Sequence, residues 1–199
     1  MSRKIFTILI HWVFAPLIKP LAYLVFDRKY LRGRYFDSPQ VLGWIWVYRS
    51  IILQKLIGFN RACPWPVSPF MRVSHPESIS FDPNDLNNFQ TFGCYFQGHP
   101  QAKIIIGKGT YIAPNVGLIT MNHNPCNLDE HLPPEDIVIG EKCWIGMNSV
   151  ILPGVNLGKR TIVAAGSVVN HSFPDGKWII GGAPAKFIKS LDCPDEIST

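Results

Sequence analysis

The sequence predicts a mainly β protein, a three-sided parallel solenoid with an apolar helical extension before it. A six-residue period fits neither a helix nor a simple alternating strand, and it is typical of a solenoid with three flat sides. Two runs of apolar residues keep this spacing: the shorter run is Ile106, Ile112 and Leu118, and the longer one is Ile139, Ile145, Ile151, Leu157, Val163 and Val169.

The period has a simple physical basis. One residue of each hexad points inward and stacks on its neighbours in the coils above and below, roughly 4.8 Å away. Small residues after the inward positions let the chain turn at the corners, as at Gly140, Gly146, Gly158 and Ala164. Residues 124–136 interrupt the period and contain Pro125, Pro133 and Pro134. We expect them to form a loop that extends away from the solenoid.

Charge and composition divide the chain. Residues 1–61 hold ten Lys and Arg against two acidic residues and half of the 24 aromatic residues, whereas the remaining 138 residues hold nine basic residues against twelve acidic ones. We predict a basic aromatic helical extension over 1–62, a connecting segment with the first irregular coils over 63–103, and the β-helix over 104–191. The five cysteines are scattered without a C-x-x-C motif, which indicates neither a disulfide framework nor a zinc knuckle and favours a cytoplasmic setting.

The N-terminal extension is apolar but interrupted. Residues 5–18 are too few to span a bilayer as a helix, and Pro16 directly after a Val-Phe-Ala site argues against a cleaved signal peptide. A second helix is predicted from Ser38 to Gly58, with Ser38 as its cap, Pro39 in its first turn and Gly58 at its end. Two roles stay open: contact with an anionic membrane surface, or packing on the solenoid or on a neighbouring subunit.

Specific motifs accompany the hexads between residues 104 and 191. They are Ile112-Ala113-Pro114-Asn115-Val116, Thr120-Met121-Asn122-His123, Trp144-Ile145-Gly146, Pro153-Gly154-Val155, Val163-Ala164-Ala165-Gly166-Ser167, and Gly182-Ala183-Pro184-Ala185. In these motifs the chain resembles the hexapeptide-repeat O-acetyltransferases, the group of galactoside, maltose and nodulation-factor acetyltransferases. The resemblance implies a left-handed parallel β-helix, a homotrimer with active sites in the clefts between subunits, acetyl-CoA as donor, and a loop that reaches over the neighbour's site.

The resemblance also implies a catalytic residue. Transfer of an acetyl group to a hydroxyl needs a base, and a neutral imidazole suits this role because its pKa lies near working pH. By resemblance the base is His123, which would take the hydroxyl proton and pass it to the leaving thiolate without an acyl-enzyme. The backbone N–H of Met147 is the candidate oxyanion donor. An acidic partner for His123 could be Asp129, Glu130 or Glu135, and the sequence does not choose among them.

The cofactor contacts are likewise implied by the resemblance. A lysine holds a phosphate as a point charge, so Lys186 and Lys189 would suit the coenzyme, although they could instead form the exposed basic end of a helix. No metal is expected. The residues implied to bind coenzyme A are Trp144, Met147, Ala165, Gly166, Asn170, His171, Lys186 and Lys189.

Three alternative functions fit the residues less well. A γ-class carbonic anhydrase-like enzyme needs three histidines at zinc; His99 and His123 could serve, but no third stands at a matching spacing. A non-catalytic hexapeptide-repeat scaffold would lack the histidine before the loop, and a nucleotidyltransferase would need a Gly-rich domain before the solenoid. The sequence therefore predicts an O-acetyltransferase for a sugar hydroxyl of a surface polysaccharide or glycan, cytoplasmic or peripheral at the inner face of the membrane, with no nucleic-acid partner.

Overall fold

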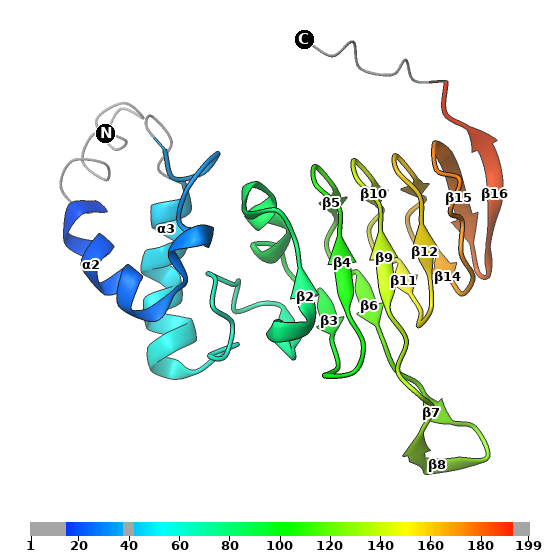
Figure 1. The fold of residues 1–199 in the computed structure, drawn as a ribbon, viewed down its shortest axis with the longest axis horizontal. Coiled ribbons are helices and arrows are strands. Elements are labelled where there is room, and N and C mark those ends of the chain that lie inside the picture. Colours follow the sequence, from blue (N-terminus) through cyan, green and yellow to red (C-terminus); the bar gives the residue numbers. More distant parts are fainter. Residues whose placement is uncertain (1–14, 38–41, 193–199) are drawn as a thin grey trace.

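The computed structural model describes residues 15–37 and 42–192, and it is mainly β with parallel sheets (Figure 1). The helical elements are α2 (Ala15–Val25), η2 (Arg28–Tyr30), α3 (Leu42–Ser50), η3 (Ile51–Ile57), η4 (Pro76–Ser78) and η5 (Pro83–Phe89). The first strands are β1 (Arg72–Ser74), β2 (Ile79–Ser80), β3 (Tyr95–Gln97), β4 (Ile104–Ile106), β5 (Tyr111–Ile112), β6 (Gly117–Ile119), β7 (His123–Asn124) and β8 (Asn127–His131). The later strands are β9 (Ile137–Ile139), β10 (Trp144–Ile145), β11 (Val150–Ile151), β12 (Asn156–Leu157), β13 (Ile162–Val163), β14 (Val168–Val169), β15 (Trp178–Gly182) and β16 (Ala185–Ser190).

The chain visits three sheets in turn. The first sheet has the order β1-β3-β6-β11-β14, the second β12-β9-β4-β2, and the third β16-β15-β13-β10-β5. Successive circuits run through β4, β5 and β6, then β9, β10 and β11, then β12, β13 and β14, and we call each circuit a coil. All pairs within the three sheets are parallel except β15 with β16.

The register confirms the six-residue period. Ile145 pairs with Val163 and Ile139 pairs with Leu157, so partners on neighbouring coils lie 18 residues, or three hexads, apart. Ile112 pairs with Ile145, which is 33 residues further on. The fifteen additional residues fall between Leu118 and Ile139, where the sequence predicts the interruption at 124–136, and the coils on its two sides remain in register.

The inward positions are buried as the period predicts. All six apolar residues of the longer run have at most 1% of their surface exposed, and Leu118 of the shorter run is fully buried. The small residues beside them are required by the close approach of neighbouring coils: a Cβ on Gly146 would lie 2.6 Å from the backbone N of Ala165. Since backbone atoms cannot move aside as a flexible side chain can, larger residues are excluded there.

Aromatic packing replaces this regular pattern before the coils. The Trp65 ring lies 5.0–5.1 Å from the rings of Tyr30, Phe81 and Phe89, and all four rings join the same hydrophobic core as the coils or pack against it. The chain is helical from Leu42 through Ile57 and turns out of the helix at Gly58, whose φ is +115°.

Parts of the predicted N-terminal helices lie outside the described residues. These parts are the expected cap at Ser38 and Pro39, and positions 5–14 of the first apolar segment. Among the helices that the structure describes, none combines the length and the apolar character needed to cross a bilayer.

Buried side-chain amides protect the first edges of two sheets. Asn60 accepts from the N–H of Val73 at 3.0 Å and donates to the carbonyl of Met71 at 2.9 Å, along the edge strand β1. Asn88 accepts from the N–H of Ile112 at 3.0 Å and donates to the carbonyl of Thr110 at 2.9 Å, along the edge strand β5. Each amide supplies the hydrogen bonds that another strand would supply, so we call Asn60 and Asn88 the amide caps.

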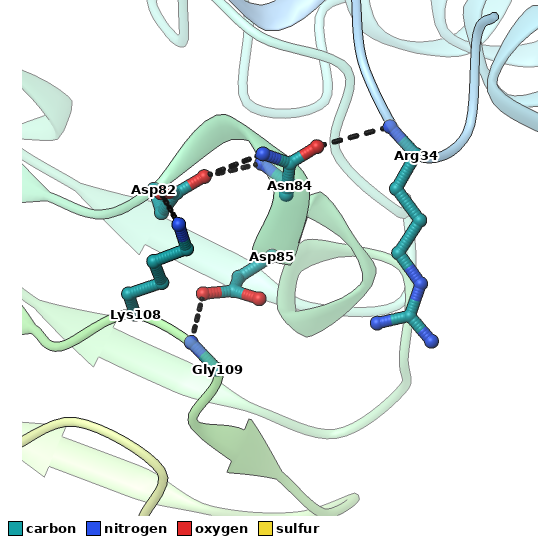
Figure 2. Close-up of polar contacts among 6 residues, drawn as sticks. All are labelled: Arg34, Asp82, Asn84, Asp85, Lys108 and Gly109. Atoms are coloured by element: carbon teal, nitrogen blue, oxygen red, sulfur yellow. Dashed lines mark hydrogen bonds and ion pairs between the residues drawn. The ribbon is translucent and has the colours of Figure 1, made fainter. Parts of the chain in front are cut away.

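A polar junction continues the protection of β5 (Figure 2). Asp85 accepts from the backbone N–H of Gly109 at 2.7 Å, and the Nζ of Lys108 lies 3.9 Å from a carboxylate oxygen of Asp82. The side-chain oxygen of Asn84 accepts from the backbone N–H of Arg34 at 3.0 Å, which ties the N-terminal region to η5. A hollow of about 340 Å³ lies at this junction and contains none of the predicted site residues; its lining is Arg32, Gly33, Asp37, Asp82, Pro83 and Asn84.

Candidate active site

The interruption of the period forms a projecting hairpin that carries His123. Strands β7 and β8 pair in antiparallel fashion, with His123 opposite His131, and the hairpin extends away from the coils in Figure 1. Its base is held by the N–H of Leu132, which donates to the Asn122 carbonyl at 2.9 Å, and by the N–H of Glu135, which donates to the Thr120 carbonyl at 2.8 Å. His123 is exposed at the base of this hairpin.

The imidazole of His123 has a defined orientation. Its Nδ1 lies 2.8 Å from the carbonyl oxygen of Leu128. A carbonyl oxygen only accepts, so Nδ1 carries the proton, and in the neutral ring the lone pair is on Nε2. The hydrogen-bond partner of His123 is therefore a backbone carbonyl, whereas only carboxylates were expected from the sequence. Of those candidates, Glu130 instead accepts from the side-chain amide of Asn124 at 3.3 Å.

A second histidine accompanies His123. The ring of His131 lies 4.3 Å from the ring of His123, with an angle of 35° between their planes. This pair could not be predicted from the sequence, because only the register of the hairpin brings position 131 opposite position 123. The two imidazoles therefore form a tilted ring pair on the projecting hairpin.

Four of the predicted cofactor residues lie on or just after strands β10 and β13 of the third sheet. Trp144 points outward from β10, with 54% of its surface exposed, while its neighbour Ile145 is fully buried. The corner between the third and first sheets follows this strand. There the carbonyl of Met147 accepts from the N–H of Gly166 at 2.8 Å, and Ala165 and Gly166 are both exposed. Gly166 has a φ of +72°, and a Cβ there would meet no atom within 4 Å.

The remaining predicted residues lie toward the C-terminal end of the coils. Asn170 and His171 are exposed just after β14, and Nδ1 of His171 lies 2.9 Å from the side-chain oxygen of Asn170. Lys186 and Lys189 are exposed on β16, where they pair with Gly181 and Ile179 of β15. The alternative that these lysines end a helix is wrong, since antiparallel pairing with β15 holds the segment extended.

Within one chain the predicted residues occupy separate corners. His123, and also Asn170 and His171, follow strands of the first sheet, whereas Met147 and Gly166 precede strands of that sheet. A three-sided coil keeps these two corners apart along its whole length. One chain therefore does not bring His123 and Met147 together.

Neither a metal cluster nor a reactive buried thiol is found among the described residues. No group of three or more His, Cys, Asp or Glu side chains in 15–37 and 42–192 is placed to hold a metal ion. Burial raises the pKa of the Cys143 thiol to about 11, and that of Cys63 to about 12. Both thiols stay protonated at neutral pH and are poor nucleophiles.

Comparison with known proteins agrees with this architecture. Residues 136–171 match the family model described as bacterial transferase hexapeptide (six repeats). A Saccharomyces cerevisiae protein, named "Putative acetyltransferase YJL218W", is 38% identical over 102 residues, which cover 49% of this chain and 51% of that protein. WbbJ of Escherichia coli K12, named as a "Putative lipopolysaccharide biosynthesis O-acetyl transferase", is 35% identical over 101 residues, which cover 45% and 51%.

A solved structure is also similar. The hexapeptide-repeat acetyltransferase VCA0836 of Vibrio cholerae, complexed with acetyl coenzyme A, is 29% identical, with a TM-score of 0.47 over 66% of this chain and 64% of that one. The chain spans about half the length of the two curated relatives described above. It carries a bacterial-transferase hexapeptide repeat, and those curated relatives are named as acetyltransferases.

Proposed function

We propose that this protein is an acetyl-CoA-dependent O-acetyltransferase that acts on a sugar hydroxyl. Its coils would wind as a left-handed β-helix, the hand that the resemblance implies against the usual right-handed crossover rule. The observation that carries the proposal is His123 itself: an exposed imidazole whose Nδ1 is held by a backbone carbonyl, so that Nε2 is available as a base.

The proposed reaction proceeds by direct transfer. Nε2 of His123 removes the proton from the acceptor hydroxyl as its oxygen attacks the thioester carbonyl carbon. The negative charge that develops on the carbonyl oxygen is stabilised by a backbone N–H, for which we propose that of Met147. The carbon–sulfur bond then breaks, and the proton on Nε2 passes to the departing thiolate. The Leu128 carbonyl keeps the other ring nitrogen protonated throughout, which preserves Nε2 as the reacting atom.

The predicted residues lie at two different corners of the coils, which supports an active site built from two copies of the chain. His123 follows the first sheet and Met147 precedes it, so a site that uses both needs two copies of the chain. We propose a homotrimer in which the hairpin of one copy faces the third sheet of the next. Light scattering of the purified protein tests this: the expected mass is three times the 22.4 kDa of one chain, and a monomer would contradict it.

The same arrangement would hold the coenzyme along the outer face of the coils. Trp144 offers an exposed ring for the pantetheine arm, and Gly166 leaves open space where a side chain would intrude. Lys186 and Lys189 stand exposed on β16, where their ammonium groups can meet phosphate. The other residues proposed for this role are Met147, Ala165, Asn170 and His171.

The acceptor class rests on a relative. WbbJ is named for lipopolysaccharide biosynthesis, and by this similarity we propose a saccharide of a surface polysaccharide or glycan. The enzyme would work in the cytoplasm or at the inner membrane face, where its donor is available. Nucleotide sugars and oligosaccharides, screened with acetyl-CoA and free-thiol release, would identify the acceptor. Acetyl transfer only to amines in that screen would contradict O-acetylation.

The substitution His123→Ala tests the base. It is expected to lower acetyl transfer by about 10²–10⁴-fold, the usual contribution of a general base, while coenzyme A affinity measured by titration calorimetry changes only a few-fold. Cys126→Ser is the matched control on the same hairpin, because direct transfer needs no cysteine. Turnover of His123→Ala close to that of the unchanged protein would eliminate the assignment, and loss of activity in Cys126→Ser would indicate an acyl-enzyme instead.

A further inference from the structure

Helix α2 has more apolar surface than residues 15–37 and 42–192 are seen to cover. Ala22 and Phe26, four residues apart, are buried against the core. Leu17, Leu21 and Leu24 follow the i, i+4, i+7 spacing of a second stripe along the helix, and 74%, 47% and 82% of their surfaces are exposed. A helix that only packed on its own protein would need one apolar stripe, so the second stripe has another use.

A second apolar group lies at the end of η3, the element against which α2 packs. Leu56, Ile57 and Phe59 have 75%, 58% and 52% of their surfaces exposed. We call these three residues, together with Leu17, Leu21 and Leu24, the leucine face, because they are exposed on or beside two elements that pack against each other. Six large exposed apolar side chains within one small helical region exceed the scattered exposure that is normal for a monomer.

The part of the chain that carries the leucine face is rich in positive charge. Residues 15–61 hold eight Lys and Arg against two Asp, a net charge of +6, whereas residues 62–199 have nine basic residues against twelve acidic ones, a net charge of −3. Arg28 and Lys29 lie in η2, the element after α2, and each lies over an aromatic ring, at 4.8 and 4.7 Å. Apolar, basic and ring-bearing side chains in one region are the combination that suits a membrane interface.

We propose that the leucine face binds the surface of an anionic lipid bilayer. The apolar side chains would enter the headgroup boundary, and nearby cations would gain about 1 kcal/mol each from anionic lipid. The charge decides between a bilayer and a second copy of the chain. Two copies meeting through this face would bring two regions of net charge +6 together, whereas an anionic bilayer complements that charge. The inference does not depend on the acetyl-transfer proposal, because binding to lipid needs no catalysis.

Flotation of the full-length protein with vesicles tests the proposal. The vesicles are phosphatidylcholine alone and phosphatidylcholine with phosphatidylglycerol, at 0.1 M and 1 M salt. The protein is expected to float with the anionic vesicles at low salt and to lose most of this binding at 1 M, where charges are screened within about 3 Å. Leu17→Glu/Leu24→Glu is expected to lower the bound fraction about tenfold or more, since each change removes apolar surface and adds a negative charge.

Two further variants make the test specific. Leu17→Ala/Leu24→Ala keeps a good helix former at both positions, so it removes apolar surface without threatening the fold, which circular dichroism checks. Leu128→Glu, an equally exposed leucine on the hairpin with 70% of its surface exposed, is the matched control and should float like the unchanged protein. Three results would overturn the proposal: no flotation with anionic vesicles, equal flotation of all variants, or a change in oligomeric mass in the α2 variants without a change in flotation.

Discussion

The coils and the N-terminal region satisfy their buried backbone in different ways. In the coils, a residue pairs with another residue 18 positions along, and the same pairing recurs from coil to coil. In the segments before the coils, single side chains supply these bonds instead: Asn60 and Asn88 each bond one N–H and one carbonyl at an edge strand. A repeated structure therefore spreads its stability over many similar contacts, whereas its first edge depends on a few specific residues.

The largest effect should come from removing an inward residue of a coil. Leu157→Ala is expected to lower the free energy of unfolding by about 2–5 kcal/mol, because Leu157 is fully buried and the narrow core cannot collapse around the space left behind. Urea denaturation measures the loss. Asn156→Ala, the outward neighbour on the same strand, should cost much less, and equal losses for the two variants would contradict the assigned inward and outward faces.

An amide cap should be the next most costly loss. Asn60→Ala leaves the Val73 N–H and the Met71 carbonyl without the amide, and removing a buried hydrogen-bond partner is expected to cost about 1–3 kcal/mol. Asn60→Asp separates the two halves of the cap, since it keeps the acceptor for Val73 but loses the donor to Met71. Thermal unfolding should rank the unchanged protein, the Asp variant and the Ala variant in that order. An Ala variant as stable as the unchanged protein would show that the edge does not depend on the amide.

The smallest expected effect is the pH dependence that Asp85 gives to the free energy of unfolding. Burial raises the pKa of the Asp85 carboxyl, so the folded protein binds this proton more readily than the unfolded chain does. The unfolding free energy due to this group therefore falls as pH rises through the interval between the ordinary pKa of an aspartate and the raised one. Asp85→Asn keeps an acceptor for the Gly109 N–H without a charge. Its melting temperature relative to the unchanged protein should be higher at pH 7 than at pH 3, and the reverse order would contradict this account.

The sequence predicted the repeated part of the fold because its signal is itself repeated. Six inward residues share one spacing, and their partners, their burial and the place of the interruption all followed from it. The amide caps carried no such signal. Asn60 and Asn88 are single residues in irregular segments, and only the three-dimensional path of the chain brings them beside β1 and β5.

The candidate site also has features that could be predicted from the sequence and features that could not. The place of His123 directly before the interruption could be predicted from the motif, and its exposure agrees with a role in chemistry. The atom that orients His123 could not be predicted, because it is the backbone carbonyl oxygen of Leu128 and every residue carries such a group. Lys186 and Lys189 show the same limit: their positions were predicted, but their place on β16 depends on pairing with β15.

The 18-residue register also restricts how the gene for this protein can change in length. An insertion of one residue inside a coil would turn every later inward side chain outward, whereas an insertion of a whole circuit would leave all later partners matched. Between His123 and Ile137 the chain has already left the coils, so that stretch can gain or lose residues one at a time. Inherited length variation should therefore occur in steps of a full turn within the stack, and freely only at the projecting hairpin.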